Sequence, residues 1–251
     1  MAQQKGIFPL KGTIGNVTFY RSKDGYMARE KGTLDANRIL NDPAFQRTRE
    51  NGAEFGRAGK AGKVLRNALR SLIQNITDGR LIARLVKEMM KVIHEDTVNP
   101  RGMRNVIDGE AALLEGFEFN SNSKLGTTLY APFTATINRL TGKLTVNIPS
   151  FAPANMVAAP AGATHFKIVS SGVEIDFENE TSVEDIQSTA ELPWNAEATA
   201  VINLENSVTP NSTKPLFLAL GIEFYQEVNG VKYPLKTGTF NSLALVKVSG
   251  E

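Results

Sequence analysis

Residue types that perform chemistry are scarce in this chain. It has 251 residues and no cysteine, which excludes thiolate nucleophiles, thiolate metal sites and disulfides. Of its two histidines, His94 ends a segment with helical spacing, where a cation is favourable, and His165 lies in a strand-like run. No G-x-S-x-G motif accompanies either imidazole to build a serine nucleophile. We therefore expect a protein that is not an enzyme and that uses no cofactor and no metal.

Two short segments have ligand-binding compositions without the spacing that binding requires. The glycine-rich stretch at residues 55–64, FGRAGKAGKV, departs from the G-x-x-x-x-G-K-[ST] phosphate loop, because Val64 stands where that loop has Ser or Thr. The acidic run at residues 174–185, EIDFENETSVED, lacks the D-x-[DN]-x-[DN]-G spacing of a calcium loop. We interpret it as a strand end followed by a solvated loop. Neither segment identifies a small-molecule substrate.

Charge is distributed unevenly along the chain. The net charge is only +2, yet residues 1–104 contain 20 Lys and Arg against 10 Asp and Glu, a balance of +10. Residues 105–251 contain 8 against 16, a balance of −8. This asymmetry indicates either an anionic partner for the front half or attraction between the front of one copy and the back of another.

Basic residues recur through the first helical segment. Such a cluster can neutralise phosphates, so nucleic acid is an alternative partner. Arg and Lys also suit an exposed helix on propensity alone. The predicted basic surface consists of Arg47, Arg49, Arg57, Lys60, Lys63, Arg66 and Arg70.

Residues 12–30, GTIGNVTFYRSKDGYMARE, predict a β-hairpin ahead of the helical segment. Asp24-Gly25 is a turn signal between two runs that are rich in apolar and aromatic residues. Gly12 and Gly15 indicate a bulge or the close approach of another backbone. A lone two-stranded hairpin is marginal in water, so its apolar face needs a cover.

The first helix is predicted to start at Asp42-Pro43, which supplies a capping carboxylate and a proline at the first helical position. Apolar and small residues, Phe55 among them, follow along one stripe at helical spacing over residues 45–69. Four glycines between residues 52 and 62 predict either a break near residues 59–62 or a close approach by another backbone. The break is the preferred interpretation.

Beyond this helix the pattern changes from helical to strand-like. A second helix is expected from residue 77 or 78 to about residue 95, and a short one over residues 105–115. After residue 116, apolar or aromatic runs alternate with turn residues, and Thr141-Gly142 and Asn229-Gly230 are tight-hairpin signals. Seven to nine short strands of this kind predict an antiparallel β-sandwich.

The expected fold class is therefore α+β, with an N-terminal β-hairpin and helical segment followed by an antiparallel β-sandwich. Two domains are expected: a basic hairpin-plus-helix domain at residues 1–116 and an acidic β-sandwich domain at residues 117–251.

The front of the chain also resembles a bacterial family of proteins of unknown function. In that family a Gly-x-(Ile/Val)-Gly-x-Val hairpin ends in Arg and precedes a helix that carries Gln-x-x-Arg. The stretch FLALGIEFYQEVNGVKYPLKTGTFNSLALVKV is similar to the family's last hairpin. The resemblance implies the two-part layout and brings no activity and no catalytic residue. The matching positions at the front are Gly12, Ile14, Gly15, Val17, Tyr26, Arg29, Gln46, Arg49 and Phe55.

These patterns favour a structural protein that assembles with copies of itself. The hairpin of one copy would pair with the β-sandwich of the next, head to tail, in a filament or a ring. Packing of the hairpin within its own chain is the open alternative. The predicted assembly interface consists of Gly12, Ile14, Gly15, Val17, Phe19, Tyr20, Tyr26 and Arg29.

Two other functions stay open, as does the location of the protein. Nucleic-acid binding by the basic half is one, and carbohydrate binding or adhesion, with Trp194 as the only tryptophan, is the other. The opening MAQQKGIFPLKGT lacks the apolar region of a secretory signal, and no window predicts a membrane span. We therefore expect a cytoplasmic protein, with leaderless export as the alternative.

Overall fold

The structure, a computed structural model, describes residues 2–6, 8–32, 35–235 and 238–250. The chain divides into two compact units, Met1–Arg49 and Glu50–Glu251, which we call the N-terminal unit and the large unit. This division differs from the expected boundary between residues 116 and 117. The reason is that the helices after residue 50 share a hydrophobic core with the strands that follow them.

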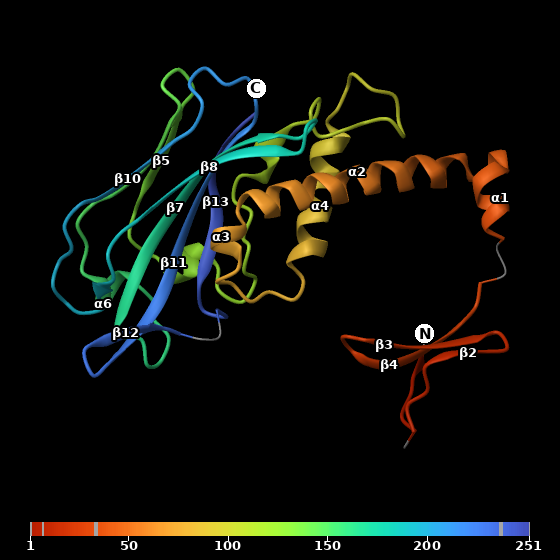
Figure 1. The fold of residues 1–251 in the computed structure, drawn as a ribbon, viewed down its shortest axis with the longest axis horizontal. Helices are drawn as coiled ribbons and strands as arrows, with labels where there is room; N and C mark the ends of the chain where they lie inside the picture. The colour runs from red at the N-terminus through yellow and green to blue at the C-terminus, as the bar shows by residue number, and fades with distance from the viewer. Residues whose placement is uncertain (1, 7, 33–34, 236–237, 251) are drawn as a thin grey trace. The chain divides into compact units, whose positions relative to one another are not determined.

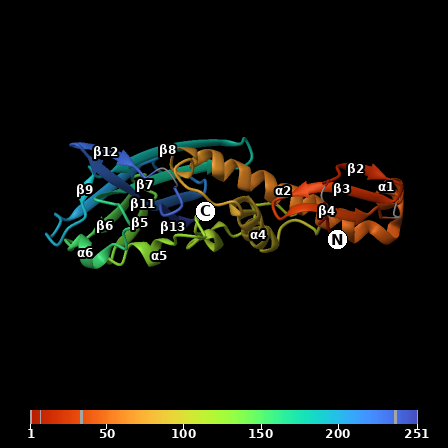
Figure 2. The ribbon, with the colours of Figure 1, turned by 90° about the horizontal axis from the view of Figure 1, so that it is seen from below.

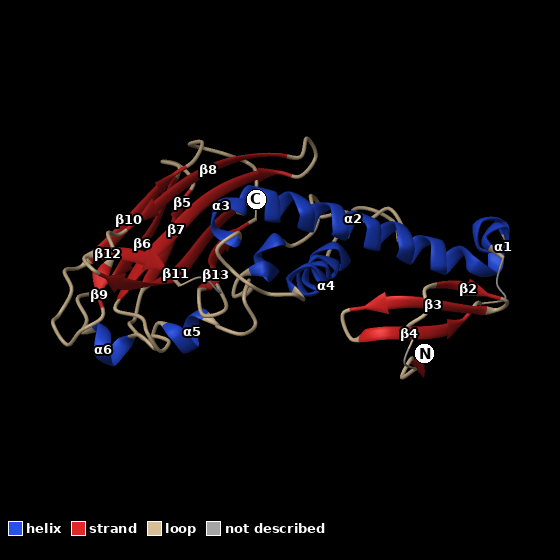
Figure 3. Cartoon of the chain, turned by 60° about the horizontal axis from the view of Figure 1, so that its bottom comes forward, coloured by secondary structure: helices blue, strands red, loops and turns tan. Residues whose placement is uncertain are grey.

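The N-terminal unit is built on a four-stranded antiparallel sheet with the strand order β1-β4-β3-β2. The expected hairpin is formed by β3 and β4, whose loop residues Lys23-Asp24 lie between the paired residues Ser22 and Gly25. A second hairpin joins β2 to β3 through Gly15-Asn16, and Figure 3 shows β2, β3 and β4 side by side. The elements of this unit are β1 Ala2–Gln3, β2 Gly12–Ile14, β3 Val17–Ser22, β4 Gly25–Glu30, the helix α1 Ala36–Asn41 and the 3-10 turn η1 Pro43–Phe45.

The helix α2, Gln46–Ala68, follows the 3-10 turn and is continuous through its four glycines. The predicted break inside this helix is therefore wrong. A Cβ atom added at Gly62 would lie 3.5 Å from a side-chain atom of Leu85 in the helix α4, Leu81–His94. The buried face of α2 consists largely of small residues, which let α4 pack close to it. Phe55, predicted on the packed stripe, is instead 61% exposed.

The second predicted helix is confirmed as α4. The carboxylate of Asp78 accepts a hydrogen bond from the backbone amide of Arg80 at 2.6 Å, immediately before the helix begins. Its apolar stripe, which includes Leu85 and Met89, is fully buried. Shorter helices complete the described α structure: α3 Arg70–Ile73, α5 Leu125–Thr128 and α6 Pro153–Met156.

The short helix predicted over residues 105–115 is wrong in extent. The structure has a 3-10 turn, η2 Ala111–Leu114, at the end of this range. Before it, the side-chain oxygen of Asn105 accepts hydrogen bonds from the backbone amides of Ile107 and Asp108 at 2.7 and 2.9 Å. This local side-chain turn competes with helix formation and explains the difference.

The strands of the large unit form two antiparallel sheets. In the larger sheet, β11 pairs with β7 along one edge and with β13 and β12 along the other, while β8 and β9 pair with the far edge of β7. The smaller sheet has the order β10-β6-β5. The hairpin signals at Thr141-Gly142 and Asn229-Gly230 lie in the turns that join β5 to β6 and β11 to β12. The strands are β5 Thr134–Asn138, β6 Lys143–Ile148, β7 His165–Asp176, β8 Thr181–Ser188, β9 Leu192–Pro193, β10 Ile202–Ser207, β11 Leu216–Val228, β12 Val231–Pro234 and β13 Ser242–Ser249.

The larger sheet is covered on both faces, as Figures 1 and 2 show. One face packs against the smaller sheet, with Phe166 and Leu218 in the same buried cluster as Val146. The other face packs against α2 and α4, and Val173 and Phe217 belong to the buried cluster that these helices share with the sheet. β11 is buried on both sides from Leu216 to Ile222, and its sequence there is apolar almost throughout and does not alternate. β7 is also buried on both sides, but it includes the buried polar residues Ser170, Ser171 and Glu174. The fold class is α+β, as predicted.

The interpretation of the acidic run at residues 174–185 as a strand end and a loop is correct for residues 174–180, but it misses a strand that begins at Thr181. β7 continues to Asp176, and β8 returns beside it from Thr181. The Asp176 carboxylate accepts hydrogen bonds from the backbone amides of Glu178 and Asn179 at 3.0 and 2.9 Å, which fixes the turn. β8 was not predicted because its sequence is polar. Pairing with β7 along one edge is enough to form this strand.

Candidate assembly interface

The register of the N-terminal sheet places most of the predicted interface residues on one face. Residues that pair directly across antiparallel strands point to the same side. Gly12 pairs with Phe19 and Ile14 pairs with Val17, while Phe19 also pairs with Ala28 on its other side. Tyr26 lies two residues from Ala28 and therefore shares this side. We call it the apolar face. The same register also places Arg21, the partner of Tyr26, and Glu30, the partner of Val17, at its ends. Its apolar members are Ile14, Val17, Phe19, Tyr26 and Ala28.

Two of the predicted interface residues lie on the opposite face. Tyr20 pairs with Met27, and Arg29 pairs with Thr18, so these side chains point away from Phe19. The guanidinium carbon of Arg29 lies 5.6 Å from the centroid of the Tyr20 ring, a cation–π contact. The set predicted from the sequence as one interface is thus divided between two faces of the sheet.

The apolar face has no buried residue. Of residues 2–6, 8–32 and 35–49, none is buried within the chain. Ile14 is 64% exposed, and Phe8, in the segment between β1 and β2, is 83% exposed. A single-layer sheet of this kind buries little apolar surface, and an exposed apolar face is typical of an interaction site. The described N-terminal unit therefore has a sheet without a core.

Gly12 and Gly15 serve the backbone rather than close packing inside the chain. Their φ angles are +117° and +57°, a region that favours glycine because other residues carry a Cβ atom. A Cβ atom at either position would meet nothing within 4 Å. Within the described residues of the N-terminal unit, no other backbone makes the close approach that the sequence suggested.

The two units have opposite net charges. Residues 1–49 contain nine Lys and Arg against four Asp and Glu, a balance of +5. Residues 50–251 contain 19 against 22, a balance of −3. The N-terminal unit therefore carries a high positive charge for its size and would be attracted to an acidic surface.

Several members of the predicted basic surface are anchors within the chain. Arg49 donates two hydrogen bonds to backbone carbonyls of its own unit, at 2.8 and 2.9 Å. Arg57 donates to the carbonyl of Gly102 at 2.7 Å, and Lys60 forms an ion pair with Glu180 at 2.7 Å. These three cations are partly used by their own chain, which reduces what they can offer a phosphate. Of the other members, Arg47, Lys63 and Arg70 are exposed and Arg66 is half-buried.

A buried ion pair that the sequence did not indicate lies on α2. Glu54 is 0% exposed, and the Nε and Nη2 atoms of Arg104 donate to its two carboxylate oxygens at 2.8 and 2.9 Å. The backbone amide of Gly102 donates to the same carboxylate at 2.7 Å. The hydrogen bonds from Arg104 hold the pKa of Glu54 below its ordinary value, although burial acts in the opposite direction. This pair fastens the loop after α4 to α2 and has a structural role.

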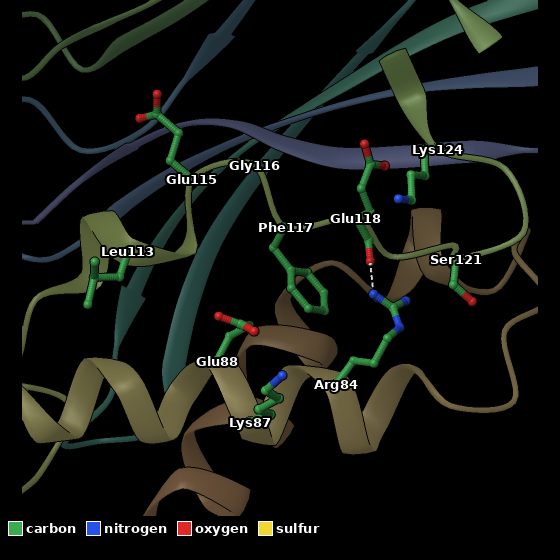
Figure 4. A pocket seen from close by; sticks show the side chains of 10 residues that line it. All are labelled: Arg84, Lys87, Glu88, Leu113, Glu115, Gly116, Phe117, Glu118, Ser121 and Lys124. Carbon is green, nitrogen blue, oxygen red and sulfur yellow. Dashed lines mark hydrogen bonds between the residues drawn. The ribbon is translucent and has the colours of Figure 1, made fainter. Parts of the chain in front are cut away.

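A pocket of about 450 Å³ lies between α4 and residues 113–124, and Figure 4 shows its lining. Arg84 donates from Nη1 to the carbonyl of Glu118 and from Nη2 to the carboxylate of Asp78, both at 2.6 Å. Its guanidinium carbon also lies 5.2 Å from the centroid of the Phe117 ring. The charged residues of the lining are Arg84, Lys87, Glu88, Glu115, Glu118 and Lys124.

The carboxyl groups near this pocket also serve the fold. Burial opposes ionisation of Asp78, but hydrogen bonds from the backbone amides of Ser121 and Arg80 and from Arg84 outweigh it and lower the pKa of Asp78. Burial raises the pKa of Glu118, whose carboxylate accepts from the backbone amide of Leu125. The lining also includes Ser121 and contains no histidine.

Neither a metal site nor a membrane helix marks the described residues. They contain no group of three or more His, Cys, Asp or Glu side chains that could hold an ion. None of the helices described here has the length and apolarity that crossing a bilayer requires. No family model, curated protein or solved structure matches the chain. The resemblance of the front segment to a bacterial family stays a prediction.

Proposed function

We propose that this protein is a non-enzymatic structural protein that assembles with copies of itself, head to tail, through its N-terminal sheet. The sheet of one copy would dock on the β-sandwich of the next. Because donor and acceptor are different surfaces, each copy can bind two others, which builds a filament or a ring.

The observation that carries this proposal is the uncovered apolar face. Five apolar or aromatic positions share one side of a well-paired sheet, and none of the described residues of the N-terminal unit is buried. A second molecule would remove this surface from water, which contributes roughly 25 cal/mol for each Å² of apolar area buried. The opposite charges of the two units favour the same contact and would accelerate it.

Light scattering of the full-length protein over a concentration series tests the proposal. We expect the mean mass to rise with concentration at low salt. Phe19→Ser should hold the protein at the monomer mass, because it places a polar side chain in the centre of the apolar face. Thr18→Ser, at the neighbouring strand position on the opposite face, is the matched control and should assemble like the natural protein. A monomer at all concentrations would refute the proposal.

A second candidate function is binding of nucleic acid by the basic N-terminal unit. Its balance of +5 over 49 residues favours it. Binding that neutralises phosphates weakens steeply with salt, with a slope of log affinity against log salt of about −0.9 per phosphate on duplex DNA. A titration of single-stranded and duplex probes at two salt concentrations tests it. No binding, or binding that does not change with salt, would exclude this function.

A further inference from the structure

We propose that the acceptor in this assembly is the outer edge of β8 and that the donor is β2 of a second copy. The inference rests on the proposed self-assembly and names the strands that meet. It follows from which residues of the two strands direct their backbone amides and carbonyls outward, from the lengths of the open edges and from the distribution of charge.

β2 lies at one edge of the N-terminal sheet and has one backbone pair that faces outward. Ile14 and Val17 flank the two-residue loop of the β2–β3 hairpin, so they form a hydrogen-bonded pair. Alternation then makes Thr13 and Thr18 a non-hydrogen-bonded pair. The backbone amide and carbonyl of Thr13 therefore point away from β3 and toward any strand that joins this edge.

β8 lies at one edge of the larger sheet. The directions of its backbone amides and carbonyls follow from those of its partner β7. The backbone amide of Ile175 donates to the carbonyl of Pro215, at the β11 side of β7. The backbone amide and carbonyl of Ile175 therefore point toward β11 and not toward Ser182, its partner on β8. By alternation, Ser182 and Glu184 present their backbone groups at the outer edge of β8. No backbone hydrogen bond in the described chain joins these two residues to another strand.

Length distinguishes this edge from the other edges of the large unit. β8 has eight residues, whereas β12 has four and the edge strands β5 and β10 of the smaller sheet have five and six. The outer side of β13 is covered, because residues 116–119 exchange backbone hydrogen bonds with Leu243 and Leu245. Along β8, Val183 is 47% exposed and Ile186 is 40% exposed, so an added strand would also find apolar surface there.

Charge complementarity selects the same edge. Residues 168–213, which span most of β7 and all of β8, β9 and β10, contain nine Asp and Glu and no Lys or Arg. Three lysines outside this range form ion pairs with it: Lys60 with Glu180 at 2.7 Å, Lys214 with Asp176 at 2.8 Å and Lys143 with Glu205 at 2.8 Å. The acidic region keeps a negative balance after these three pairs are counted.

The donor strand carries the opposite charge at both ends. Lys11 directly precedes β2 and is exposed. Lys31 is held beside the β2–β3 turn, because its backbone amide donates to the carbonyl of Asn16 at 2.6 Å. Either orientation of β2 along β8 therefore brings a lysine toward the acidic turn of the β7–β8 hairpin.

Proline substitutions test the edge pairing, since proline removes one backbone donor and is tolerated where that donor faces outward. Thr13→Pro removes the donor from β2, and Ser182→Pro removes one from the outer edge of β8. Thr13→Val and Ser182→Val keep the donors and are the matched controls. By light scattering, we expect each proline variant to remain monomeric while both valine controls assemble.

A mixture of the two proline variants keeps the test informative. Each variant retains the surface that the other has lost, so an equimolar mixture should form dimers of twice the monomer mass and no larger species. Circular dichroism of each variant verifies that it is folded. If Ser182→Pro is folded and assembles as the natural protein does, β8 is not the acceptor, although self-assembly stands. If the natural protein itself never assembles, the proposed function has failed first.

Charge reversal gives an independent test. We expect Lys11→Glu with Lys31→Glu to weaken association about tenfold or more, because like charges would then meet at the contact. Glu178→Lys with Glu180→Lys should do the same from the acceptor side, and a mixture of the two double variants should recover association. If association in the mixture is as weak as in each double variant alone, the acceptor lies on another surface.

Discussion

The N-terminal sheet and the larger sheet of the large unit both contain apolar and aromatic strand residues. The side chains of these residues differ in how far they are buried. In the large unit, Phe217 and Phe166 are fully buried, on opposite faces of one sheet. In the N-terminal unit, Phe19 lies in the middle of a paired sheet and is only half-buried, as are Val17 and Tyr26. Strand pairing alone does not bury a side chain; a second layer does.

The large unit supplies its own second and third layers. Helices cover one face of its larger sheet and the smaller sheet covers the other. The described N-terminal unit has one short helix, α1, and none of that helix is buried. The difference predicts that the large unit is stable by itself and that the N-terminal sheet gains stability when a partner covers it.

The largest expected effect contrasts two phenylalanines. Phe217→Ala should lower the free energy of unfolding of the large unit by about 3–5 kcal/mol, because it opens a cavity in a closed core. Phe19→Ala should change the unfolding of that unit by less than about 0.5 kcal/mol. Denaturant titration followed by the fluorescence of Trp194, which lies in the large unit, measures both. Equal losses would show that the sheets are not independent.

A smaller loss is expected when the buried ion pair is broken. Arg104→Ala leaves the carboxylate of Glu54 buried without its main partner, which should cost about 3 kcal/mol. Lys63→Ala removes an exposed cation from the same helix and is the control, with an expected change within about 0.5 kcal/mol. Chemical denaturation at neutral pH compares them. No difference between these variants would contradict the structural role of the pair.

Acid should weaken the large unit through carboxylates whose pKa is lowered in the folded state. Hydrogen bonds lower the pKa of Glu54, Asp78 and Asp96. Their contribution is therefore complete above the unfolded values of 4.5 for Glu and 3.8 for Asp and is lost as the pH falls below them. Unfolding free energies measured from pH 7 to pH 3 should decline below about pH 4.5. Glu54→Gln should have a shallower decline; an unchanged slope would contradict this assignment.

The smallest expected effect concerns two glycines, one in the helix α2 and one in the loop after α4. A Cβ atom at Gly56 would meet nothing within 4 Å, so Gly56→Ala should raise stability by about 0.5–1 kcal/mol. Gly102→Ala is the contrast: its φ is +86° and a Cβ atom would lie 2.8 Å from Glu50, so it should destabilise. Thermal unfolding of both variants gives the signs. A stabilising Gly102→Ala would contradict the loop geometry.

The sequence predicted what periodicity and turn chemistry determine locally. The stripe of α4, the hairpin at residues 12–30 and the turns at Thr141-Gly142 and Asn229-Gly230 were all readable from spacing. The continuous α2 was not, because glycine lowers helix propensity and the packing of α4 on small residues compensates for it. β8 was not predicted for a related reason: its composition is polar, and backbone pairing with β7 stabilises it.

The candidate interface was predicted in part. Composition selected the N-terminal strands, but the division of their side chains between two faces depends on register, which turn signals alone did not give. The Glu54–Arg104 pair depends on a contact between residues 50 positions apart in the sequence. No local pattern contains that information.

Hydrogen exchange at several protein concentrations tests the central claim most directly. The amides of β3 and β4 report whether a second molecule covers the N-terminal sheet, and those of β7 and β11 serve as the internal reference. We predict that protection of β3 and β4 rises with concentration while that of β7 and β11 stays constant. Protection of the N-terminal sheet that is the same at all concentrations would contradict the claim that this sheet is covered by another copy.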